Sequence, residues 1–281
     1  MLQDFFILNP RIAVAYSGGV DSSYLLYAAK NAGCDVRAYF VKSQFQPEFE
    51  RADALAFSES TGVPLTIGTL DVLSESEVAS NPPDRCYHCK TAILSHLWEL
   101  ARADGYTILC DGTNADDDES DRPGMRALRE LGVSSPLREN GLSKADIRRL
   151  SKQAGLSMHD KPSYSCLATR IPTGIAITED LLAKIERAEN ALFGMGFTDF
   201  RVRLQPLGFP PHGANNSKCD APGVPHGSDT NAPSYSPDAT YGAKLELPEA
   251  QWATAATRRK EILEALTPDF KEVTLNLATR P

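Results

Sequence analysis

A loop rich in serine and glycine constrains the fold of this chain more than any other feature. It runs from residue 17 to residue 23 with the sequence SGGVDSS, directly after the apolar stretch 12–16 and ahead of a helical pattern. Adjacent glycines let the backbone turn sharply and approach an anion, and the unpaired N–H groups at a helix start attract negative charge. The loop predicts a strand, a turn that binds triphosphate or pyrophosphate, and a helix. A ligand-free turn that only caps the helix is the alternative.

The presence of Asp21 in the loop indicates that a metal ion binds together with the phosphates. A carboxylate would repel a bound phosphate, so a Mg²⁺ ion that bridges Asp21 to the phosphates explains its presence in the loop. The loop matches neither the P-loop pattern G-x-x-x-x-G-K-[ST] nor the dinucleotide pattern G-x-G-x-x-G. It therefore indicates a different class of nucleotide-binding fold.

Apolar segments alternate with amphipathic helical patterns through the first half of the chain. Strands are expected at 12–16, 36–41, 65–70 and 107–110, and helices from the loop to about 32, at about 48–61 and at about 89–103. Alternation of this kind predicts an α/β fold with a doubly wound parallel sheet, which binds ligands at the carboxyl ends of its strands. The phosphate loop, Ser43 and the run Asp111 to Asn114 each follow a strand and are expected at that edge.

The pattern changes after Cys166, where we expect a second, smaller α+β domain. A helix from Thr178 as N-cap to about 193 is followed by strands at 200–204, 244–247 and 273–275, with a helix at about 248–266 before the last strand. Residues 205–241 are rich in Pro, Gly, Ser and Asn and predict a flexible insertion. We therefore expect a first domain over 1–172 and a second over 173–281.

Composition narrows the class of protein. The chain has 281 residues, 42% of them hydrophobic, and a net charge of -8. This length favours two domains, and the acidic balance speaks against nucleic acid as a partner. No apolar run approaches the roughly 20 residues that span a membrane, and the N-terminus lacks the basic start of a secretory signal. A cytoplasmic protein without membrane partners is expected.

Three of the six cysteines are candidates for chemistry, because a reducing cytoplasm favours metal binding or catalysis over structural disulfides. Cys34 and Cys110 adjoin predicted strands and are expected to be small buried residues, and Cys219 lies in the insertion and is expected to be inert. The remaining three are Cys86, Cys89 and Cys166.

Three readings of these cysteines stay open. Three thiolates would leave one iron of a [4Fe-4S] cluster without a protein ligand. A structural zinc site would need a fourth ligand, which His88 or His159 could supply. Cys86 and Cys89 could instead form a redox dithiol.

Charged side chains suggest two further anion or metal sites. The acidic loop 116–124 is either a solvated turn or a source of carboxylates for Mg²⁺, with Arg122 or Arg126 near phosphate. Arg201 and Arg203 alternate on a predicted strand and share a face, where a bound phosphate or carboxylate would relieve their repulsion. A solvated face is the alternative.

Several motifs, taken in order, resemble one family. The loop alone resembles the pyrophosphatase loop of enzymes that adenylylate a substrate with ATP. The full set of motifs comprises SGGVDSS at 17–23, NPPDRCYHCK at 81–90, DGTN at 111–114, RPG at 122–124, SSPL at 134–137, SCLATRIP at 165–172 and RVR at 201–203. Together they resemble the LarE family, ATP-dependent sulfur transferases of nickel-pincer nucleotide biosynthesis.

The resemblance implies a two-stage reaction. A carboxylate of pyridinium-3,5-biscarboxylic acid mononucleotide is adenylylated with release of pyrophosphate, and sulfur then displaces AMP to leave a thiocarboxylate. One branch of the family sacrifices the sulfur of a single cysteine, which matches Cys166. The other branch uses three cysteines to hold a [4Fe-4S] cluster that carries an extra sulfide, and the presence of Cys86, Cys89 and Cys166 fits this branch.

The resemblance also assigns roles by matching position. Contacts to ATP phosphates or Mg²⁺ are implied for Ser17, Gly18, Gly19, Asp21, Ser22 and Ser23. Ser43 and Gly112 are implied near adenosine, and Lys90 near the phosphates. The phosphate of the small-molecule nucleotide substrate is implied to contact Thr169, Arg170, Arg201 and Arg203. A homo-oligomer and a separate sulfur donor are further implications.

Two rival functions remain at this stage. An ATP-dependent tRNA thiolation enzyme would share the loop and often a cluster, but it needs a basic RNA surface, which a chain with 29 basic and 37 acidic residues does not favour. A nucleotide-binding module stabilised by zinc, without turnover, would keep the loop alone. An amide-forming synthetase would leave the three cysteines unexplained.

Overall fold

The computed structural model describes residues 2–117, 123–207 and 240–278. Arg122, Cys219 and most of the predicted insertion at 205–241 lie outside these ranges. The chain divides into two compact units. The first unit comprises Met1–Ala168 and Ile177–Leu182, and the second comprises Thr169–Ala176 and Ala183–Pro281.

The first unit is built on a four-stranded parallel sheet. Its strands are β1 (Arg11–Ala15), β2 (Asp35–Lys42), β3 (Leu65–Thr69) and β4 (Leu109–Cys110). They lie in the order β3-β2-β1-β4, and every pairing is parallel. The predicted α/β class with a parallel sheet is confirmed.

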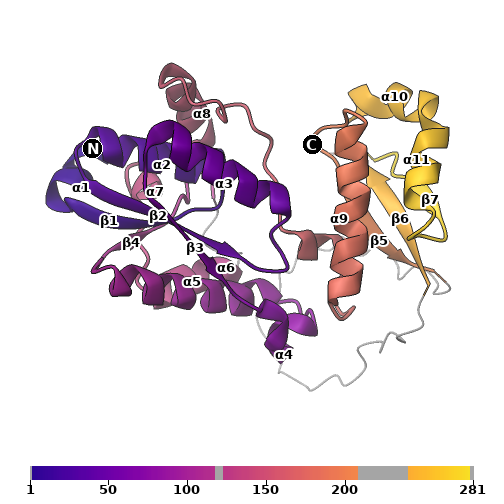
Figure 1. The fold of residues 1–281 in the computed structure, drawn as a ribbon, viewed down its shortest axis with the longest axis horizontal. Helices are drawn as coiled ribbons and strands as arrows, with labels where there is room; N and C mark the ends of the chain where they lie inside the picture. The colour runs from indigo at the N-terminus through magenta and orange to yellow at the C-terminus, as the bar shows by residue number, and fades with distance from the viewer. Residues whose placement is uncertain (1, 118–122, 208–239, 279–281) are drawn as a thin grey trace, which may run out of the picture. The chain divides into compact units, whose positions relative to one another are not determined.

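Helices cover both faces of this sheet (Figure 1). α2 (Val20–Asn31) and α3 (Glu48–Thr61) lie on one face, and α5 (Arg85–Ala103) with α6 (Pro123–Glu130) on the other. Alternation along β1 feeds both cores, because Ile12 and Val14 belong to one buried cluster and Ala13 to the other. The sheet is therefore buried on both sides, as a doubly wound fold requires.

Two helix boundaries of the first unit bear on the site. α3 has the predicted bounds and ends at Gly62, whose φ of 63° satisfies a left-handed C-cap. α5 was expected to begin near Cys89 and in fact begins at Arg85, so Cys86 and Cys89 lie in its first two turns. The preceding prolines account for the start, since the Arg85 N–H donates to the Pro82 carbonyl at 3.0 Å.

Shorter elements complete the first unit. They are α1 (Leu2–Leu8), the 3₁₀ turn η1 (Val72–Ser74), α4 (Ser76–Ala79), α7 (Pro136–Glu139) and α8 (Lys144–Gln153). The sequence SKAD at 143–146 has the pattern of a capping box and predicts the start of a helix. The structure confirms it, because Ser143 and Asp146 satisfy each other's backbone N–H groups at the start of α8. No helix among the described residues is both long enough and apolar enough to cross a bilayer.

The second unit holds a three-stranded mixed sheet. β5 (Arg201–Pro206) pairs antiparallel with β6 (Tyr241–Glu246), which pairs parallel with β7 (Val273–Leu275). The 3₁₀ turn η2 (Leu167–Arg170) and α9 (Glu179–Gly194) precede β5. Thr178 caps α9 as predicted, because its hydroxyl accepts from the Leu181 N–H at 3.2 Å.

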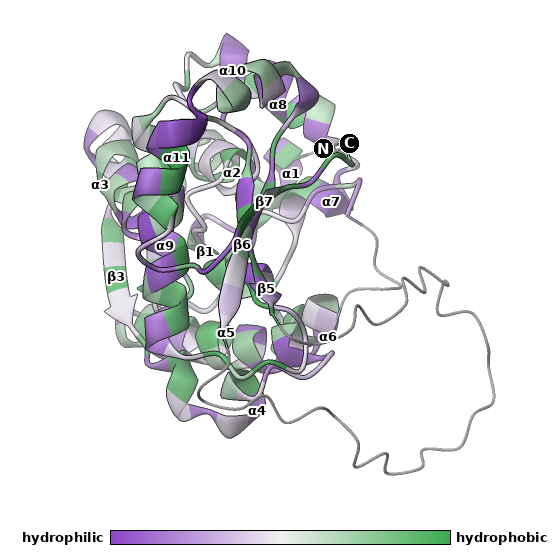
Figure 2. Ribbon diagram, turned by 90° about the vertical axis from the view of Figure 1, so that its right-hand side faces the viewer, coloured by the Kyte–Doolittle hydropathy of each residue, from purple (hydrophilic) through white to green (hydrophobic). Residues whose placement is uncertain are grey.

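One predicted helix of the second unit is wrong. The segment 248–266 forms the 3₁₀ turn η3 (Glu249–Gln251) and two helices, α10 (Trp252–Thr257) and α11 (Arg259–Leu266). The break falls at Arg258, which leaves the helical region with ψ of 17° and donates to the Met195 carbonyl and to Glu261. The helices nevertheless keep apolar and polar sides, as Figure 2 shows for α9 and α11.

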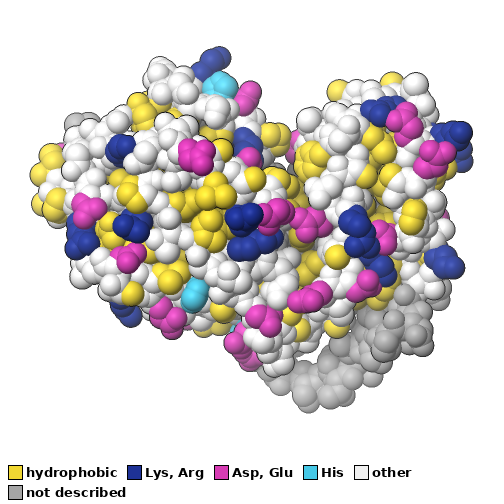
Figure 3. All heavy atoms as spheres, in the orientation of Figure 1, with side chains coloured by type: hydrophobic (Ala, Val, Ile, Leu, Met, Phe, Trp, Pro, Cys, Tyr) yellow, Lys and Arg dark blue, Asp and Glu magenta, His cyan; other side chains and the backbone are white. Residues whose placement is uncertain are grey.

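Charges on the face seen in Figure 3 are of mixed sign. Lys and Arg side chains of the described residues lie beside Asp and Glu there and do not gather into one broad basic surface. Ion pairs among the described residues include Arg51 with Glu48 and Arg187 with Asp269. This face therefore offers no electrostatic platform for a polyanion.

Candidate functional site

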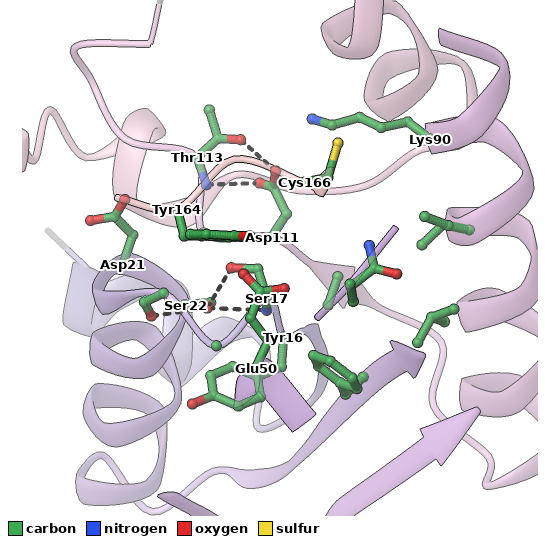
Figure 4. Close-up of a pocket in the computed structure, with 18 of the residues that line it drawn as sticks. Tyr16, Ser17, Asp21, Ser22, Glu50, Lys90, Asp111, Thr113, Tyr164 and Cys166 are labelled. Carbon is green, nitrogen blue, oxygen red and sulfur yellow. Dashed lines mark hydrogen bonds between the residues drawn. The ribbon is translucent and has the colours of Figure 1, made fainter. Parts of the chain in front are cut away.

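A cavity of about 500 Å³ opens at the carboxyl ends of β1, β2 and β4 in the first unit. This is the edge at which a doubly wound sheet binds its ligands. The cavity is lined by most of the residues that the sequence singled out, namely Ser17, Gly18, Gly19, Asp21, Ser22, Cys86, Cys89, Lys90, Gly112 and Cys166. In Figure 4 Asp21 and Ser22 lie at one side of the cavity, and Lys90 and Cys166 at the other.

The loop between β1 and α2 adopts the conformation that an anion site needs. Gly18 has φ of 72°, a left-handed value that glycine adopts without strain, and Gly19 forms the N-cap of α2 without a side-chain hydrogen bond to the helix. The Ser17 N–H donates to Ser22 Oγ at 3.3 Å. Residues 17–22 of this loop line the cavity, and binding of phosphate by their N–H groups stays a prediction.

The backbone at Gly112 lies so close to this loop that only glycine fits there. A Cβ placed on Gly112 would lie 2.7 Å from the Ser22 backbone nitrogen and 3.0 Å from its Cα. Both atoms are backbone at the start of α2, so neither can move aside cheaply. The glycine thus lets the chain after β4 lie directly against the phosphate-binding turn.

Asp21 has one occupied and one unsatisfied carboxylate oxygen. Its Oδ2 accepts from Lys144 Nζ at 2.6 Å and from Asn114 Nδ2 at 3.3 Å. Its Oδ1 is buried and has no hydrogen-bond partner among the described residues. An unpaired buried carboxylate oxygen is costly, so this atom fits a role as a ligand of Mg²⁺, which binds proteins through one or two carboxylates and completes its shell with phosphates and water.

Three lysines bring positive charge to the cavity. Lys144, at the start of α8, is ion-paired with Asp21, and Lys161 contacts the Gly18 carbonyl at 3.0 Å and Asp53 at 2.6 Å. Lys90 lines the cavity and makes no ion pair with any residue that the structure describes. The sequence pattern identified Lys90 alone, because Lys144 and Lys161 reach the loop only through the tertiary fold.

The three candidate cysteines differ in exposure although they share the cavity. Cys86 is exposed, Cys166 is half-buried and Cys89 is buried. Burial raises the pKa of the Cys89 thiol to about 12, with a further rise from Cys166. Cys34 and Cys110 do not line the cavity, and burial raises the pKa of each thiol. Cys110 is buried as predicted, whereas Cys34 is only partly buried, so the prediction of full burial is wrong for Cys34.

Arg85 places a buried positive charge among these thiols. Its Nη1 lies 3.8 Å from Cys166 Sγ, its Nε donates to Asn81 Oδ1 at 3.3 Å, and its guanidinium stands over the Phe45 ring at 5.5 Å. Burial lowers the pKa of Arg85, but the three cysteines together outweigh that effect and raise it. A cation held here favours negative charge on sulfur.

Ser23 and Ser43 stand behind the cavity wall. Ser23 is buried, and its hydroxyl donates to the Gly19 carbonyl at 2.8 Å. The Ser43 hydroxyl and N–H both contact Gln46 Oε1, at 2.6 and 3.1 Å. Gln46 lines the cavity, and with its oxygen held in this way its amide nitrogen is left to meet a ligand. Direct contact of either serine with nucleotide stays a prediction.

Arg126 lies outside the lining of the cavity. Its guanidinium stacks on the Tyr87 ring at 3.5 Å, and its Nε lies 3.6 Å from Glu130 Oε1. Tyr87 also donates to Glu130 at 2.6 Å, so the three side chains tie α6 to α5. A phosphate contact of Arg126 stays a prediction, and the structure gives this side chain a packing role.

Comparison with known proteins places the chain in a family. A family model described as the tRNA methyl transferase HUP domain matches residues 10–61, which contain the phosphate loop. An uncharacterised protein of Synechocystis sp. is 37% identical over 73% of this chain and 76% of its own length. A pyridinium-3,5-bisthiocarboxylic acid mononucleotide synthase of Lactiplantibacillus plantarum is 34% identical over 69% of this chain and 71% of its own. The chain belongs to the LarE family.

Membership of the LarE family makes the chain an ATP-dependent sulfurtransferase of the PP-loop class. More distant relatives include a tRNA-specific 2-thiouridylase of Pseudothermotoga lettingae, 26% identical over 58% of this chain and 57% of its own. This LarE family member is therefore more similar in sequence to the mononucleotide synthase than to the tRNA thiolase.

The three thiols of this LarE family member do not form a ready-made site for a single metal ion. No group of three or more His, Cys, Asp or Glu side chains within 2–117, 123–207 and 240–278 is arranged to hold one metal ion. That result disfavours a preformed zinc site of Cys86, Cys89, Cys166 and a histidine. His88 instead lies between Glu77 and Asp84, at 3.4 and 3.3 Å. The ligands of a cubane each bind a different iron, so three thiols on one cavity wall still fit a cluster.

The predicted substrate-phosphate residues form one group within the second unit. Arg201 and Arg203 alternate with buried Val202 and Leu204 on β5, as predicted. Arg203 Nη1 donates to the Thr169 carbonyl at 2.7 Å, and its Nε lies 2.8 Å from Glu246 Oε1. The strand thus holds Arg203 against the turn that carries Thr169.

Arg170 is a buried structural residue in this group. Its guanidinium is fully buried and lies 2.8 Å from Glu189 Oε1 and 3.2 Å from Oε2, while Nη1 donates to Thr169 Oγ1 at 2.9 Å. Glu189 was not identified from the sequence, because its spacing of 19 residues from Arg170 offers no local signal. A substrate contact of Arg170 stays a prediction.

Proposed function

We propose that this enzyme adenylylates a carboxylate of pyridinium-3,5-biscarboxylic acid mononucleotide and replaces AMP by sulfur. One observation carries the proposal: a single cavity bears the phosphate loop and three cysteine side chains. A carboxylate oxygen attacks the α-phosphorus of ATP, the bond from that phosphorus to the bridging oxygen breaks, and pyrophosphate leaves. Sulfur then attacks the acyl carbon, the carbon–oxygen bond to AMP breaks, and AMP leaves with the electron pair.

The ATP-binding part of the reaction is assigned to the loop together with Lys90 and Lys144. N–H groups of Gly18 to Ser22 receive the phosphates, and Lys90 neutralises charge that develops on the leaving pyrophosphate. Mg²⁺ would bind Asp21 Oδ1, which is buried and lacks a hydrogen-bond partner among the described residues. Lys144 holds the other oxygen and so fixes the carboxylate in place.

The sulfur half belongs to Cys86, Cys89 and Cys166. These thiolates would hold a [4Fe-4S] cluster, which when bound supplies an extra sulfide as the transferable sulfur. Arg85 stabilises negative charge on the sulfurs, since its guanidinium lies 3.8 Å from Cys166 Sγ. A sacrificial Cys166 is the competing source, and it would consume one cysteine per sulfur transferred.

Binding of the mononucleotide substrate is assigned to residues 173–281 together with the turn before them. Thr169, Arg201 and Arg203 are proposed to bind the phosphate of the mononucleotide, because two guanidiniums on one strand face make a bidentate anion site. Residues 1–172 form the ATP half of the proposed division. Assembly as a homo-oligomer and reloading by an external sulfur donor stay predictions.

Pyrophosphate release tests the adenylylation step. Purified protein, kept anaerobic, is incubated with ATP, Mg²⁺ and the pyridinium biscarboxylate mononucleotide, and pyrophosphate, AMP and the product mass are followed. We expect release only with the acceptor and a product heavier by the oxygen-to-sulfur difference. Gly112→Ala should abolish release, and Gly194→Ala, where the added Cβ meets nothing within 4 Å, serves as the matched control. No release with this acceptor would refute the proposal.

Metal content tests the sulfur source. Near four irons with matching acid-labile sulfide in the wild type, lost in Cys86→Ala and Cys166→Ala but kept in Cys34→Ala, would support the cluster. Stoichiometric zinc would contradict it. A protein without metal that loses the Cys166 sulfur during turnover, detected as a mass loss of the intact chain, would establish the sacrificial route.

Thiolation of tRNA is the second candidate, favoured by the HUP domain match and the distant thiouridylase relatives. It requires phosphate contacts over a broad basic surface, and the face in Figure 3 carries mixed charge. Retained binding of tRNA at moderate salt, together with ATP-dependent sulfur incorporation into the tRNA, would favour it over the small-molecule acceptor.

A further inference from the structure

An irregular segment of the first unit connects the phosphate side of the cavity to its cysteine side. Residues 161–166 have no helix or strand structure, and five of the six line the cavity, Lys161, Pro162, Ser163, Tyr164 and Cys166. Lys161 is at one end, beside the phosphate loop, and Cys166 is at the other. The Lys161 N–H donates to the Met158 carbonyl at 3.1 Å, but the segment belongs to no helix or strand, so side-chain contacts contribute much of what fixes its position.

The Lys161 end is fixed by charge. Lys161 Nζ donates to the Gly18 carbonyl at 3.0 Å and lies 2.6 Å from Asp53 Oδ2 on α3. The Arg148 guanidinium, from α8, donates to the carbonyls of His159 at 3.0 Å and Lys161 at 2.9 Å. The ammonium of Lys161 therefore joins three parts of the fold at the loop that receives phosphate.

The Cys166 end makes contacts of another kind. Tyr164 packs edge-on against Phe49, with ring centroids 4.9 Å apart. The Leu167 N–H donates to the Phe45 carbonyl at 3.0 Å, and Arg85 lies 3.8 Å from Cys166 Sγ. The contacts at Lys161 differ from these because they are short and carry a full charge, which makes hydrogen bonds stronger than neutral ones.

We propose that Lys161 is a positioning residue that holds the cysteine-bearing segment 161–166 on the phosphate loop. The acyl adenylate is formed at that loop, and its transfer to sulfur competes with hydrolysis. Sulfur at Cys166 captures the activated acyl group only while the segment stays in place, because the rate of such a step depends steeply on the distance between reacting atoms. This inference rests on the proposed function, but Lys161 takes part in neither bond change.

Loss of Lys161 should uncouple the two halves of the reaction. In Lys161→Ala, pyrophosphate release continues, whereas the yield of thiocarboxylate per pyrophosphate falls about tenfold or more. Asp53→Asn keeps the shape of the partner and removes its charge, so a smaller decrease in the same direction is expected. Lys152→Ala, an exposed lysine on α8, is the matched control and should leave the ratio unchanged.

A thiol-labelling measurement tests the same idea without turnover. N-ethylmaleimide is added to the metal-free wild type and variants, and alkylation of the peptide that contains Cys166 is followed by mass spectrometry, with and without a non-hydrolysable ATP analogue and Mg²⁺. In the wild type the analogue should change the labelling rate, because it binds at the loop to which the segment is tied. In Lys161→Ala labelling should be faster by severalfold and indifferent to the analogue.

The outcomes separate the two proposals. Absence of pyrophosphate release by the wild-type protein would refute the proposed function. The labelling of Cys166 would still decide the role of Lys161. An unchanged product ratio and unchanged labelling in Lys161→Ala overturn the positioning role. Should Lys161→Ala fail to fold, Lys161→Gln and Asp53→Asn carry the test, and wild-type behaviour in both of them would equally overturn it.

Discussion

Replacing Glu189 by Gln should destabilise the second unit strongly, because it breaks a buried ion pair. The side chains of Arg170 and Glu189 are 0% and 2% exposed, so water screens neither charge. Glu189 accepts from Arg170 Nε and Nη2, and its Oε1 also accepts from the Val202 N–H at 3.0 Å. The amide keeps the Val202 contact but turns a donor toward the guanidinium and leaves it as an uncompensated buried cation.

The expected cost is about 3–5 kcal/mol in the free energy of unfolding. Arg170→Met in the Glu189→Gln background removes the stranded charge and should recover most of this loss, to within about 1–2 kcal/mol of the wild type. Such recovery would show that the single substitution acts through Arg170.

Tryptophan fluorescence makes the assay specific to one unit. The chain has two tryptophans, Trp98 in α5 of the first unit and Trp252 in α10 of the second. Urea unfolding in a Trp98→Phe background reports the second unit alone, and in a Trp252→Phe background the first. A loss below about 1 kcal/mol for Glu189→Gln in the Trp98→Phe background, or an equal loss in both backgrounds, would refute the reasoning.

Three further predictions concern the cavity. Gly112→Ala should weaken ATP binding more than tenfold in a calorimetric titration, because its Cβ would meet backbone at 2.7 Å, while Gly194→Ala should bind normally. Ser43→Ala removes the hydroxyl that orients the Gln46 amide. It should lower the affinity for ATP by about two- to tenfold, which corresponds to the loss of one hydrogen bond. An unchanged ATP titration would contradict this role of Ser43. In the metal-free protein, iodoacetamide at pH 8 should label the exposed Cys86 and spare Cys89. Because burial raises the pKa of Cys89 from 9.0 to about 12, the stability that its neutral thiol contributes is complete below pH 9 and is lost as the pH rises toward 12. Labelling of Cys89 at pH 8 at the rate of Cys86 would contradict this.

Local pattern predicted those parts of the fold that depend on neighbours in sequence. The bounds of α3, the capping box of α8 and the alternation of β5 follow from periodicity and cap chemistry, and all three are present. The helix predicted over 248–266 failed because Arg258 bonds to the distant Met195 carbonyl, and no local signal contains that partner. At such points tertiary contacts override the helix propensity of the local sequence.

By itself, the sequence determined the chemistry available to this protein: a loop that turns its N–H groups toward phosphate, a carboxylate suited to Mg²⁺, and three thiols in two motifs. Only the tertiary structure decided which groups meet. It brought Lys144 and Lys161 to the loop, put Arg85 beside Cys166, and took Arg126 away to a tyrosine ring. The reason is physical. Residue type and spacing fix what a side chain can bind, whereas contacts between segments far apart in the sequence arise only when helices pack on both faces of the sheet.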